Sequence, residues 1–226
     1  VEGSLHPFPG YTLTLPQGQR EAFKRLVREA TPSPLVFRNH YTALGPESCL
    51  RLREASCILS SSPLALTAGC SHSSQISEAL SAELLVEYGL RLRETEMELT
   101  YLRPSPKIDF TCTHASSGTI VGVSVTRAFK GDASGKSRFS SRVARALVAK
   151  KLNGLNKAWE SIKPEQRWRV SVLHVWAPSA RNAARVEAAF REHCTASRVV
   201  TPVLLLLTST SFDCPIAYAY IYNHFS

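Results

Sequence analysis

Residues 107–129 read KIDFTCTHASSGTIVGVSVTRAF, and this stretch decides the fold that the sequence predicts. Its two halves, 107–114 and 119–128, are rich in β-branched and aromatic side chains, which favour strands. Between them, residues 116–118 read Ser-Ser-Gly and have the composition of a tight turn. The stretch therefore predicts two antiparallel strands joined by a short turn.

The residues before this pair extend it. Residues 94–102 alternate apolar and polar side chains, a pattern typical of a strand with one solvent-facing side. A helix is predicted earlier, at 74–90, where apolar residues recur at helical spacing and Gly89 ends the pattern. Three consecutive strands with short connections indicate an antiparallel meander.

The residues after the pair alternate between helix and strand. Helices are predicted at 140–162 and 180–194, and strands at 169–176 and 199–207. Strands joined through helices favour parallel pairing and place the helices on the faces of the sheet. The predicted fold class is therefore α/β, with a mixed central sheet built from an antiparallel meander plus βα units and flanked by helices.

The first 70 residues have a different character. Prolines and glycines near the start predict an extended arm, and short helices are predicted at 19–30 and 46–57. We therefore expect an N-terminal segment, 1–70, and a main domain, 71–226. The end of the chain, 216–225, alternates in part and is a candidate for one more strand.

The composition limits the class of protein and its partners. The chain has 226 residues, of which 44% are hydrophobic, which is ordinary globular usage. Its formal net charge is +9, and such an excess of Lys and Arg favours polyanionic partners, RNA or DNA above all. The alternative is an ordinary basic surface. No apolar run approaches the roughly 18 residues of a membrane span, so none is predicted.

The cysteines and the first residue bear on the compartment. None of the six cysteines forms a Cys-x-x-Cys pair or a zinc-like cluster with histidine, so we expect free thiols in a reducing, intracellular compartment. Because the chain begins at Val1 rather than Met, we expect a processed product or a part of a longer protein. The mitochondrial matrix is one candidate location, and the nucleus and cytoplasm stay open.

Four segments carry a family resemblance. They are ALSAELLVEYG (79–89), the meander up to residue 129, RVARALVAKKLNGLNKAW (142–159) and WRVSVLHVWAP (168–178). Their order of helix, meander, helix and strand resembles the core of the PD-(D/E)XK, or restriction-endonuclease-like, nuclease superfamily, and a poorly characterised eukaryotic branch of it. The resemblance covers about residues 75–207. It implies Mg²⁺-dependent chemistry on phosphodiester bonds of DNA or RNA.

The resemblance also implies a set of site residues. Asp109 matches the acid of the second strand, and Glu83 or Glu87 matches the glutamate of the preceding helix. The third strand departs from the family pattern, because Ser124 takes the place of the second acid and Thr126 that of the lysine. Neither residue carries a charge, so the predicted metal site is reduced to Asp109 and one helical glutamate.

Nearby charged residues can replace the lost groups. Lys150 or Lys151, on the helix after the third strand, can reach the vacant lysine position, and Glu96 or Glu98 can supply an acid from the first strand. The alternative is that all four are solvent-exposed charges, as most Lys and Glu residues are. Asp109 itself has the alternative of an exposed position on an edge strand.

Four basic residues lie at the end of the third predicted strand or in the loop after it. They are candidates for contacts with nucleic-acid phosphates: Arg127, Lys130, Lys136 and Arg138. A solvated strand end and loop is the alternative.

We therefore expect a nuclease-fold protein with an inactive centre, which binds nucleic acid or is a component of a ribonucleoprotein assembly such as the mitochondrial ribosome. In that case it needs no cofactor, and other proteins of the assembly are its partners. One alternative is an active Mg²⁺-dependent nuclease. The other is a protein-interaction scaffold, whose N-terminal segment would contact a partner.

Overall fold

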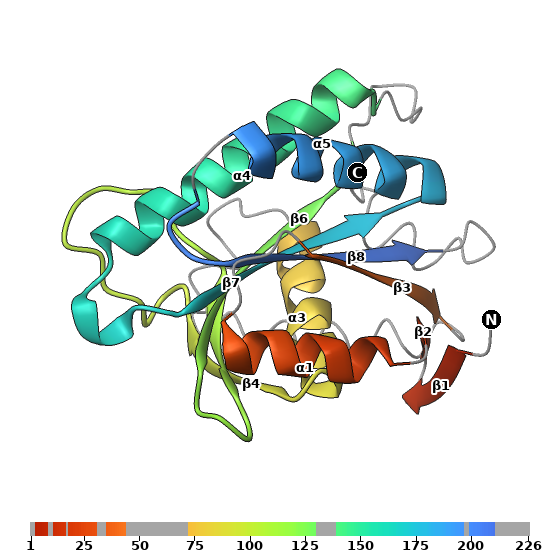
Figure 1. Ribbon diagram of the computed structural model, residues 1–226, viewed down its shortest axis with the longest axis horizontal. Coiled ribbons are helices and arrows are strands. Elements are labelled where there is room, and N and C mark those ends of the chain that lie inside the picture. Colours follow the sequence, from red (N-terminus) through yellow and green to blue (C-terminus); the bar gives the residue numbers. More distant parts are fainter. Residues whose placement is uncertain are drawn as a thin grey trace.

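The computed structural model describes residues 3–8, 11–16, 18–30, 35–43, 72–129, 139–196 and 199–210. Within them, eight strands form one sheet in the order β1-β2-β3-β8-β7-β6-β5-β4 (Figure 1). The strands are β1 (Gly3–Phe8), β2 (Tyr11–Pro16), β3 (Leu35–Ala43), β4 (Leu90–Thr95), β5 (Phe110–His114), β6 (Ile120–Arg127), β7 (Val170–Ala177) and β8 (Val203–Thr210). The helices are α1 (Gln19–Glu29), α3 (His72–Glu87), α4 (Ser141–Ser161), a 3-10 turn (Pro164–Gln166) and α5 (Ala180–Ala196).

The sheet is mixed in the way the sequence predicts. Strands β4, β5 and β6 form an antiparallel meander, and β6, β7 and β8 are parallel neighbours. The crossovers between the parallel strands are α4 and α5. The α/β class, the central mixed sheet and the flanking helices are therefore confirmed.

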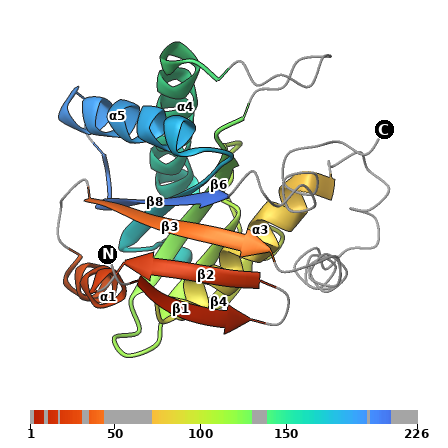
Figure 2. The same ribbon diagram turned by 90° about the vertical axis from the view of Figure 1, so that its right-hand side faces the viewer.

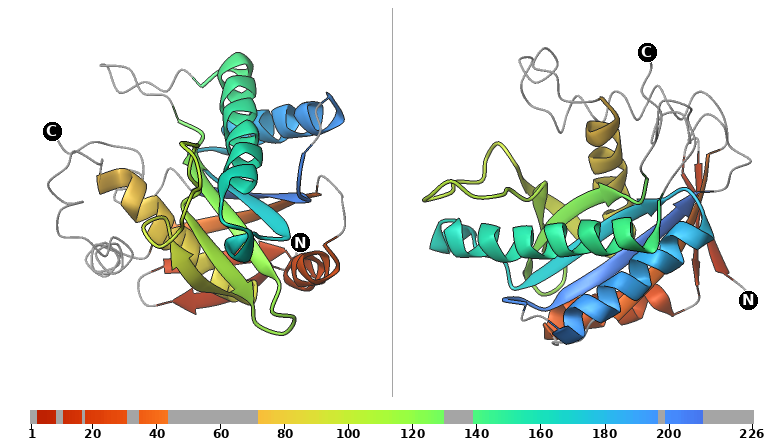
Figure 3. Two further views of the ribbon diagram at one scale, coloured as in Figure 1. Left: turned by 90° about the vertical axis from the view of Figure 1, so that its left-hand side faces the viewer. Right: turned by 90° about the horizontal axis from the view of Figure 1, so that it is seen from above.

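Helices cover both faces of the sheet, as Figure 3 shows. Helices α4 and α5 lie against each other on one face, and α1 and α3 cover the other. Side chains of β7 alternate between the two layers: Val172 and Trp176 pack with α1 and α3, whereas Leu173 and Val175 pack with α4 and α5. This strand is buried along its whole length, which is why its sequence is a nearly unbroken apolar run.

Helix α4 is the longest helix and follows the predicted boundaries closely. Ser140 caps its start, because its side chain accepts a hydrogen bond from the backbone N–H of Val143. The side chains that face the sheet recur at helical spacing and are Ala144, Val148, Leu152, Leu155 and Ala158. The opposite side of α4 is therefore left to solvent.

The predicted strand at 94–102 is wrong in its position. Strand β4 ends at Thr95, and the chain then turns, because the Glu98 carboxylate accepts hydrogen bonds from the Thr95 backbone N–H, at 2.7 Å, and from its hydroxyl. Beyond the turn only Tyr101 makes a β-bridge, with Ile162. The alternating pattern arose because Leu99 packs beneath α4 whereas Met97 is 65% exposed.

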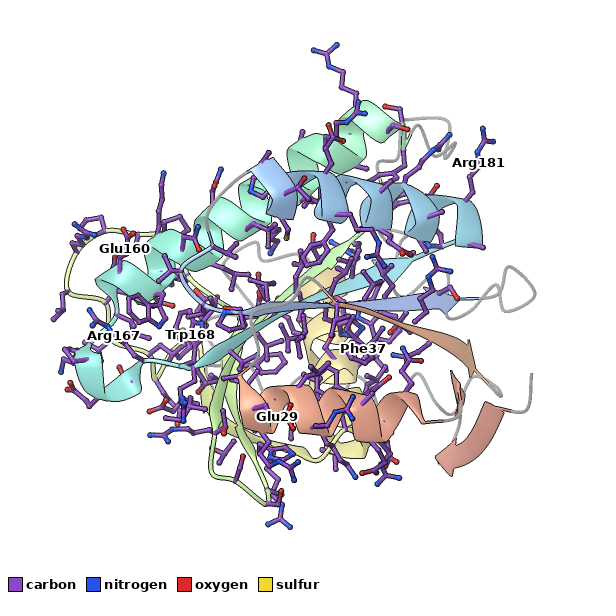
Figure 4. All side chains as sticks on the ribbon, viewed as in Figure 1. Glu29, Phe37, Glu160, Arg167, Trp168 and Arg181 are labelled. Carbon is purple, nitrogen blue, oxygen red and sulfur yellow. The ribbon has the colours of Figure 1, made fainter. Side chains whose placement is uncertain are left out.

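The N-terminal residues extend the sheet instead of forming a detached arm (Figure 2). Strands β1 and β2 are an antiparallel hairpin, and β3 pairs in parallel with β8, so the sheet runs across the predicted boundary at residue 70. Phe37 of β3 points toward α1, where its ring meets that of Phe23 with centroids 5.1 Å apart (Figure 4). The helix predicted at 46–57 and the strand at 216–225 lie outside the described residues.

Two further expectations can be compared with the described part of the chain. No helix in it combines the length and apolarity that a bilayer crossing requires. Cys112 lies buried in β5, as predicted for a strand residue, and Cys194 is half-buried on α5; both are free thiols.

Candidate functional site

Asp109 is held at the entrance to β5, beside the second half of β6. Its backbone N–H donates to Val123 O at 3.1 Å. Its side chain accepts two hydrogen bonds at Oδ2, from the Val125 N–H at 2.6 Å and from Ser124 Oγ at 3.1 Å. The side chain is 16% exposed, so the alternative of a fully solvated Asp109 does not hold. These bonds fix the carboxylate beside the middle of β6, next to Ser124 and Val125.

Lys151 reaches the same point from α4. Its ammonium nitrogen donates to Val125 O at 2.7 Å and to Ser124 Oγ at 3.2 Å, and it lies 4.0 Å from Asp109 Oδ2. The side chain is 27% exposed. Of the two lysines that the sequence proposed, Lys151 is therefore the one that reaches β6. Its neighbour Lys150 is exposed and lies on the outer side of α4, away from this cluster.

Ser124 and Thr126 lie on one face of β6, because alternate residues of a strand share a face. Ser124 is buried and links the two charged groups, since its hydroxyl donates to Asp109 and accepts from Lys151. Thr126 is half-buried. The group that joins the carboxylate of Asp109 to the ammonium of Lys151 is therefore a neutral hydroxyl.

The helical acid closest to this cluster is Glu78 of α3, which the sequence argument missed. Burial raises its pKa to about 8, and the charges of Asp109 and Glu96 act in the same direction, against the opposing effects of Lys151 and Arg127. Glu83 and Glu87 follow it on the same helix by five and nine residues. At about 100° per residue, they lie about 140° and 180° around the helix from Glu78. The structure therefore does not bring them to Asp109.

The sequence contains little signal for Glu78, because two of the buried residues beside it, Ser77 and Ser81, are polar. The buried positions of α3 include Ser77, Ser81 and Leu84, and Glu78 borders this buried side. A carboxylate next to a buried helical stripe is unusual unless it has partners. Glu83 and Glu87 were assigned from the family resemblance, which does not fix how each residue is rotated about the helix axis.

Burial and the neighbouring hydrogen-bond donors shift the pKa of Asp109 in opposite directions. Burial raises the pKa of its carboxyl group, while the Lys151 ammonium, the Val125 N–H and the Ser124 hydroxyl lower it. Glu78 has no such set of hydrogen-bond donors among the causes that act on its pKa. The pKa of the Asp109 carboxyl group therefore stays above its ordinary value, because burial outweighs these donors, and the pKa of Glu78 is raised to about 8.

Glu96 and Arg127 lie close enough to contribute charge to this centre. Glu96 raises the pKa of both acids and pairs with Lys107 at 3.3 Å. Arg127, at the end of β6, lowers the pKa of Glu78. Glu98, by contrast, is exposed and is used in the turn after β4. The other predicted phosphate-binding residues, Lys130, Lys136 and Arg138, lie outside the described residues.

The donor set matches a magnesium ion only in part. In the described ranges, no three His, Cys, Asp or Glu side chains are grouped so that they could hold a metal ion. Glu78 and Asp109 supply two carboxylates, and Mg²⁺ binds through so few only when water and substrate phosphate complete its shell. The ammonium of Lys151 beside Asp109 opposes cation binding. What the centre offers directly is two carboxyl groups, a hydroxyl and an ammonium group.

Fold and site together define an α/β protein with a carboxylate–lysine centre where the start of β5, the middle of β6 and α4 meet. Comparison of the chain with protein-family models, with curated proteins and with solved structures gave no significant match. The function is therefore argued from the residues of the centre and from the surface around it.

Proposed function

We propose that this protein binds nucleic acid on a nuclease-like α/β core whose centre is closed by the ion pair of Lys151 with Asp109. Three features support the core assignment: the order of α3, the meander, α4 and β7; the parallel pairing of β6 with β7; and the position of Asp109 directly before the second strand of the meander. The formal net charge of +9 supports a polyanionic partner. A ribonucleoprotein assembly is one setting for such a protein.

The observation that carries this proposal is the contact of Lys151 with Ser124, Val125 and Asp109. The ammonium group neutralises the strand carboxylate, and Glu78 is protonated at neutral pH because its pKa is raised to about 8. A divalent ion requires ionised carboxylates. It therefore binds weakly where one acid is protonated and the other is paired with an ammonium group. Binding therefore accounts for the centre better than hydrolysis does.

A Mg²⁺-dependent nuclease is the second candidate, and the proximity of Glu78 to Asp109 favours it. An acid whose pKa is raised by burial and by a neighbouring acid is a frequent feature of functional centres. In this case Glu78 and Asp109 would hold the ion, which activates water and stabilises charge on the phosphate. Lys151, next to Ser124, would orient the attacking water or hold its proton.

The test compares binding with cleavage on the same labelled oligonucleotides. Single- and double-stranded DNA and RNA are titrated with wild-type protein and with Asp109→Asn, with EDTA, Mg²⁺ or Mn²⁺. The proposal expects affinity that falls with salt, equal in both proteins, and intact oligonucleotides. Metal-dependent cleavage that Asp109→Asn abolishes would replace it with the nuclease. The absence of salt-dependent binding to all four would overturn both.

A further inference from the structure

Helix α4 carries positive charge on the side that faces away from the sheet. Its buried residues face β7 and α5, whereas Arg142, Lys150 and Lys157 are all exposed. Two small or neutral residues, Ala146 and Asn153, lie between them on the exposed side. The helix therefore presents three long cations without a bulky or acidic side chain between them. We call Arg142, Lys150 and Lys157 the α4 stripe.

The charges of the α4 stripe are not neutralised by the residues around them. In the described part of the chain, none of the three has an acidic partner. Two other charged residues of α4 do form ion pairs: Arg145 pairs with Glu192 at 2.8 Å, and Glu160 pairs with Arg103 at 3.5 Å. Glu160 is also the only acid of the helix. The stripe is therefore a local excess of positive charge that internal ion pairs leave intact.

The neighbouring helix shows that this is not the general character of the surface. The charged side chains of α5 carry both signs, with Arg181, Arg185 and Arg191 against Glu187 and Glu192. Arg191 pairs with Glu187 one turn away, at 3.0 Å. Such mixed faces are ordinary for a solvated helix. The two helices lie side by side on one face of the sheet, so the stripe is bounded by a near-neutral surface (Figure 3).

The spacing of the stripe suits a chain of phosphates. With a rise of 1.5 Å per residue, Arg142 and Lys150 are about 12 Å apart along the axis, and Lys150 and Lys157 about 10 Å. The three lie within about 80° around the helix. The stripe is therefore about 22 Å long, and a nucleic-acid strand with a charge every 3.4 Å of duplex axis presents about six phosphates over that length. A compact anion would contact only one of the three cations.

We propose that the α4 stripe is the surface on which the sugar–phosphate backbone of a nucleic acid lies, parallel to α4. The inference rests on the proposed function, and it specifies the face of the molecule that performs it. Lys150 of the stripe is adjacent in sequence to Lys151 of the centre. A backbone on this face therefore runs beside the helix that supplies the centre with its lysine, while the contacts that hold it are made by the opposite side of that helix.

The experiment removes the stripe and, separately, an equal charge elsewhere. The stripe variant is R142Q/K150Q/K157Q. The matched control is R25Q/R91Q/R181Q, in which the three arginines are exposed, lie on different elements and have no acidic partner among the described residues; Arg181 projects from α5 into solvent (Figure 4). Both variants lower the formal charge of +9 by three. Circular dichroism and a thermal melt establish that each is folded.

The measurement is the dependence of log K on log salt concentration for labelled single- and double-stranded RNA and DNA. Each phosphate contact contributes about −0.7 to −0.9 to this slope. We expect the stripe variant to lose about two to three contacts, a slope shallower by about 2, and the control to keep the wild-type slope. RNA and DNA arms identify which polymer binds more tightly to the stripe.

Three outcomes overturn the inference, and only the third also overturns the proposed function. Equal loss in the two variants would mean that net charge, and not the stripe, governs binding, while the proposed function stands. Unchanged slopes in the stripe variant would place the backbone on another surface, again with the proposed function intact. If wild-type protein binds no nucleic acid in a salt-dependent way, the proposed function fails first and the inference fails with it.

Discussion

The ammonium nitrogen of Lys151, on α4, lies 4.0 Å from Oδ2 of Asp109, at the entrance to β5, and the hydroxyl of Ser124 bridges the two. A neutral hydroxyl at the bridging position lets the ammonium approach the carboxylate without a second acid between them. The same contact links the long helix to the meander. It therefore bears on stability as well as on the chemistry of the centre.

The ion pair should appear as a coupling energy in a double-mutant cycle. Lys151→Met removes the cation and two hydrogen bonds, and we expect it to cost about 1–3 kcal/mol in the free energy of unfolding. Asp109→Asn keeps the shape and should cost less in the Lys151→Met background than in wild type, by about 1 kcal/mol. Urea unfolding measures all four proteins. Strictly additive costs would show that the two groups do not interact in solution.

Glu78 should make the protein less stable as the pH rises. Its folded-state pKa of about 8 lies above the ordinary value of 4.5, so the folded state binds the proton more tightly. Its contribution to stability is complete below about pH 4.5 and is lost as the pH rises through about 8.

Glu78→Gln should flatten this profile. Between pH 5 and pH 9, the free energy of unfolding should fall by about 1–3 kcal/mol less in Glu78→Gln than in wild type. Urea unfolding between pH 5 and 9 measures it. Glu165→Gln is the control, because Glu165 is exposed on the 3-10 turn. A wild-type slope retained in Glu78→Gln would remove Glu78 from the centre.

Lys151 should limit the affinity of the centre for divalent cations. Lys151→Met leaves Asp109 without its neighbouring positive charge, so Mn²⁺ should bind about tenfold more tightly than to wild type, a gain of about 1.4 kcal/mol. Calorimetric titration of Mn²⁺ measures this, and Lys150→Met on the outer side of α4 is the matched control. Equal or weaker binding in Lys151→Met would show that something other than this ammonium group closes the centre.

Two glycines should respond to alanine in opposite directions. A Cβ atom on Gly122 of β6 would lie 2.5 Å from ring atoms of Trp168, whose indole N–H is fixed to Ser171 at 2.8 Å. Gly122→Ala should therefore cost about 1–3 kcal/mol through overpacking. Gly154→Ala, on α4, meets only Pro106 at 3.7 Å and should gain about 0.5–1 kcal/mol from helix propensity. Thermal melts of both proteins decide; equal stability of Gly122→Ala and wild type would contradict the close packing.

The order of helices and strands was accessible from the sequence because it depends on local periodicity. Residues 140–162 repeat apolar positions at the spacing of a helix, and 169–176 are apolar almost throughout, as a strand buried on both faces must be. The strand at 94–102 was misplaced because alternation over a few residues also occurs in a turn. There Leu99 is buried for a different reason, its contact with α4.

The residues of the centre could not be selected from local sequence patterns. Asp109 and Lys151 were both candidates from the sequence, but so were Lys150, Glu83 and Glu87, and no local pattern separates adjacent charged residues. The separation came from the rotation of each helix about its own axis. Packing of Val148 and Leu152 against the sheet turns Lys151 inward and Lys150 outward. In the same way, the burial of Leu80 and Leu84 on α3 leaves Glu78 toward Asp109.

The sequence by itself determined the α/β class, the mixed sheet with its flanking helices, and the uncharged side chains at Ser124 and Thr126. Each of these depends on residue types and short-range spacing, which the chain carries locally. Only the tertiary structure decided that Glu78 is the helical acid, that Lys151 pairs with Asp109, and that the N-terminal strands complete the same sheet. Those relationships join residues far apart in the chain, and they depend on how the apolar faces of helices and strands meet in the core.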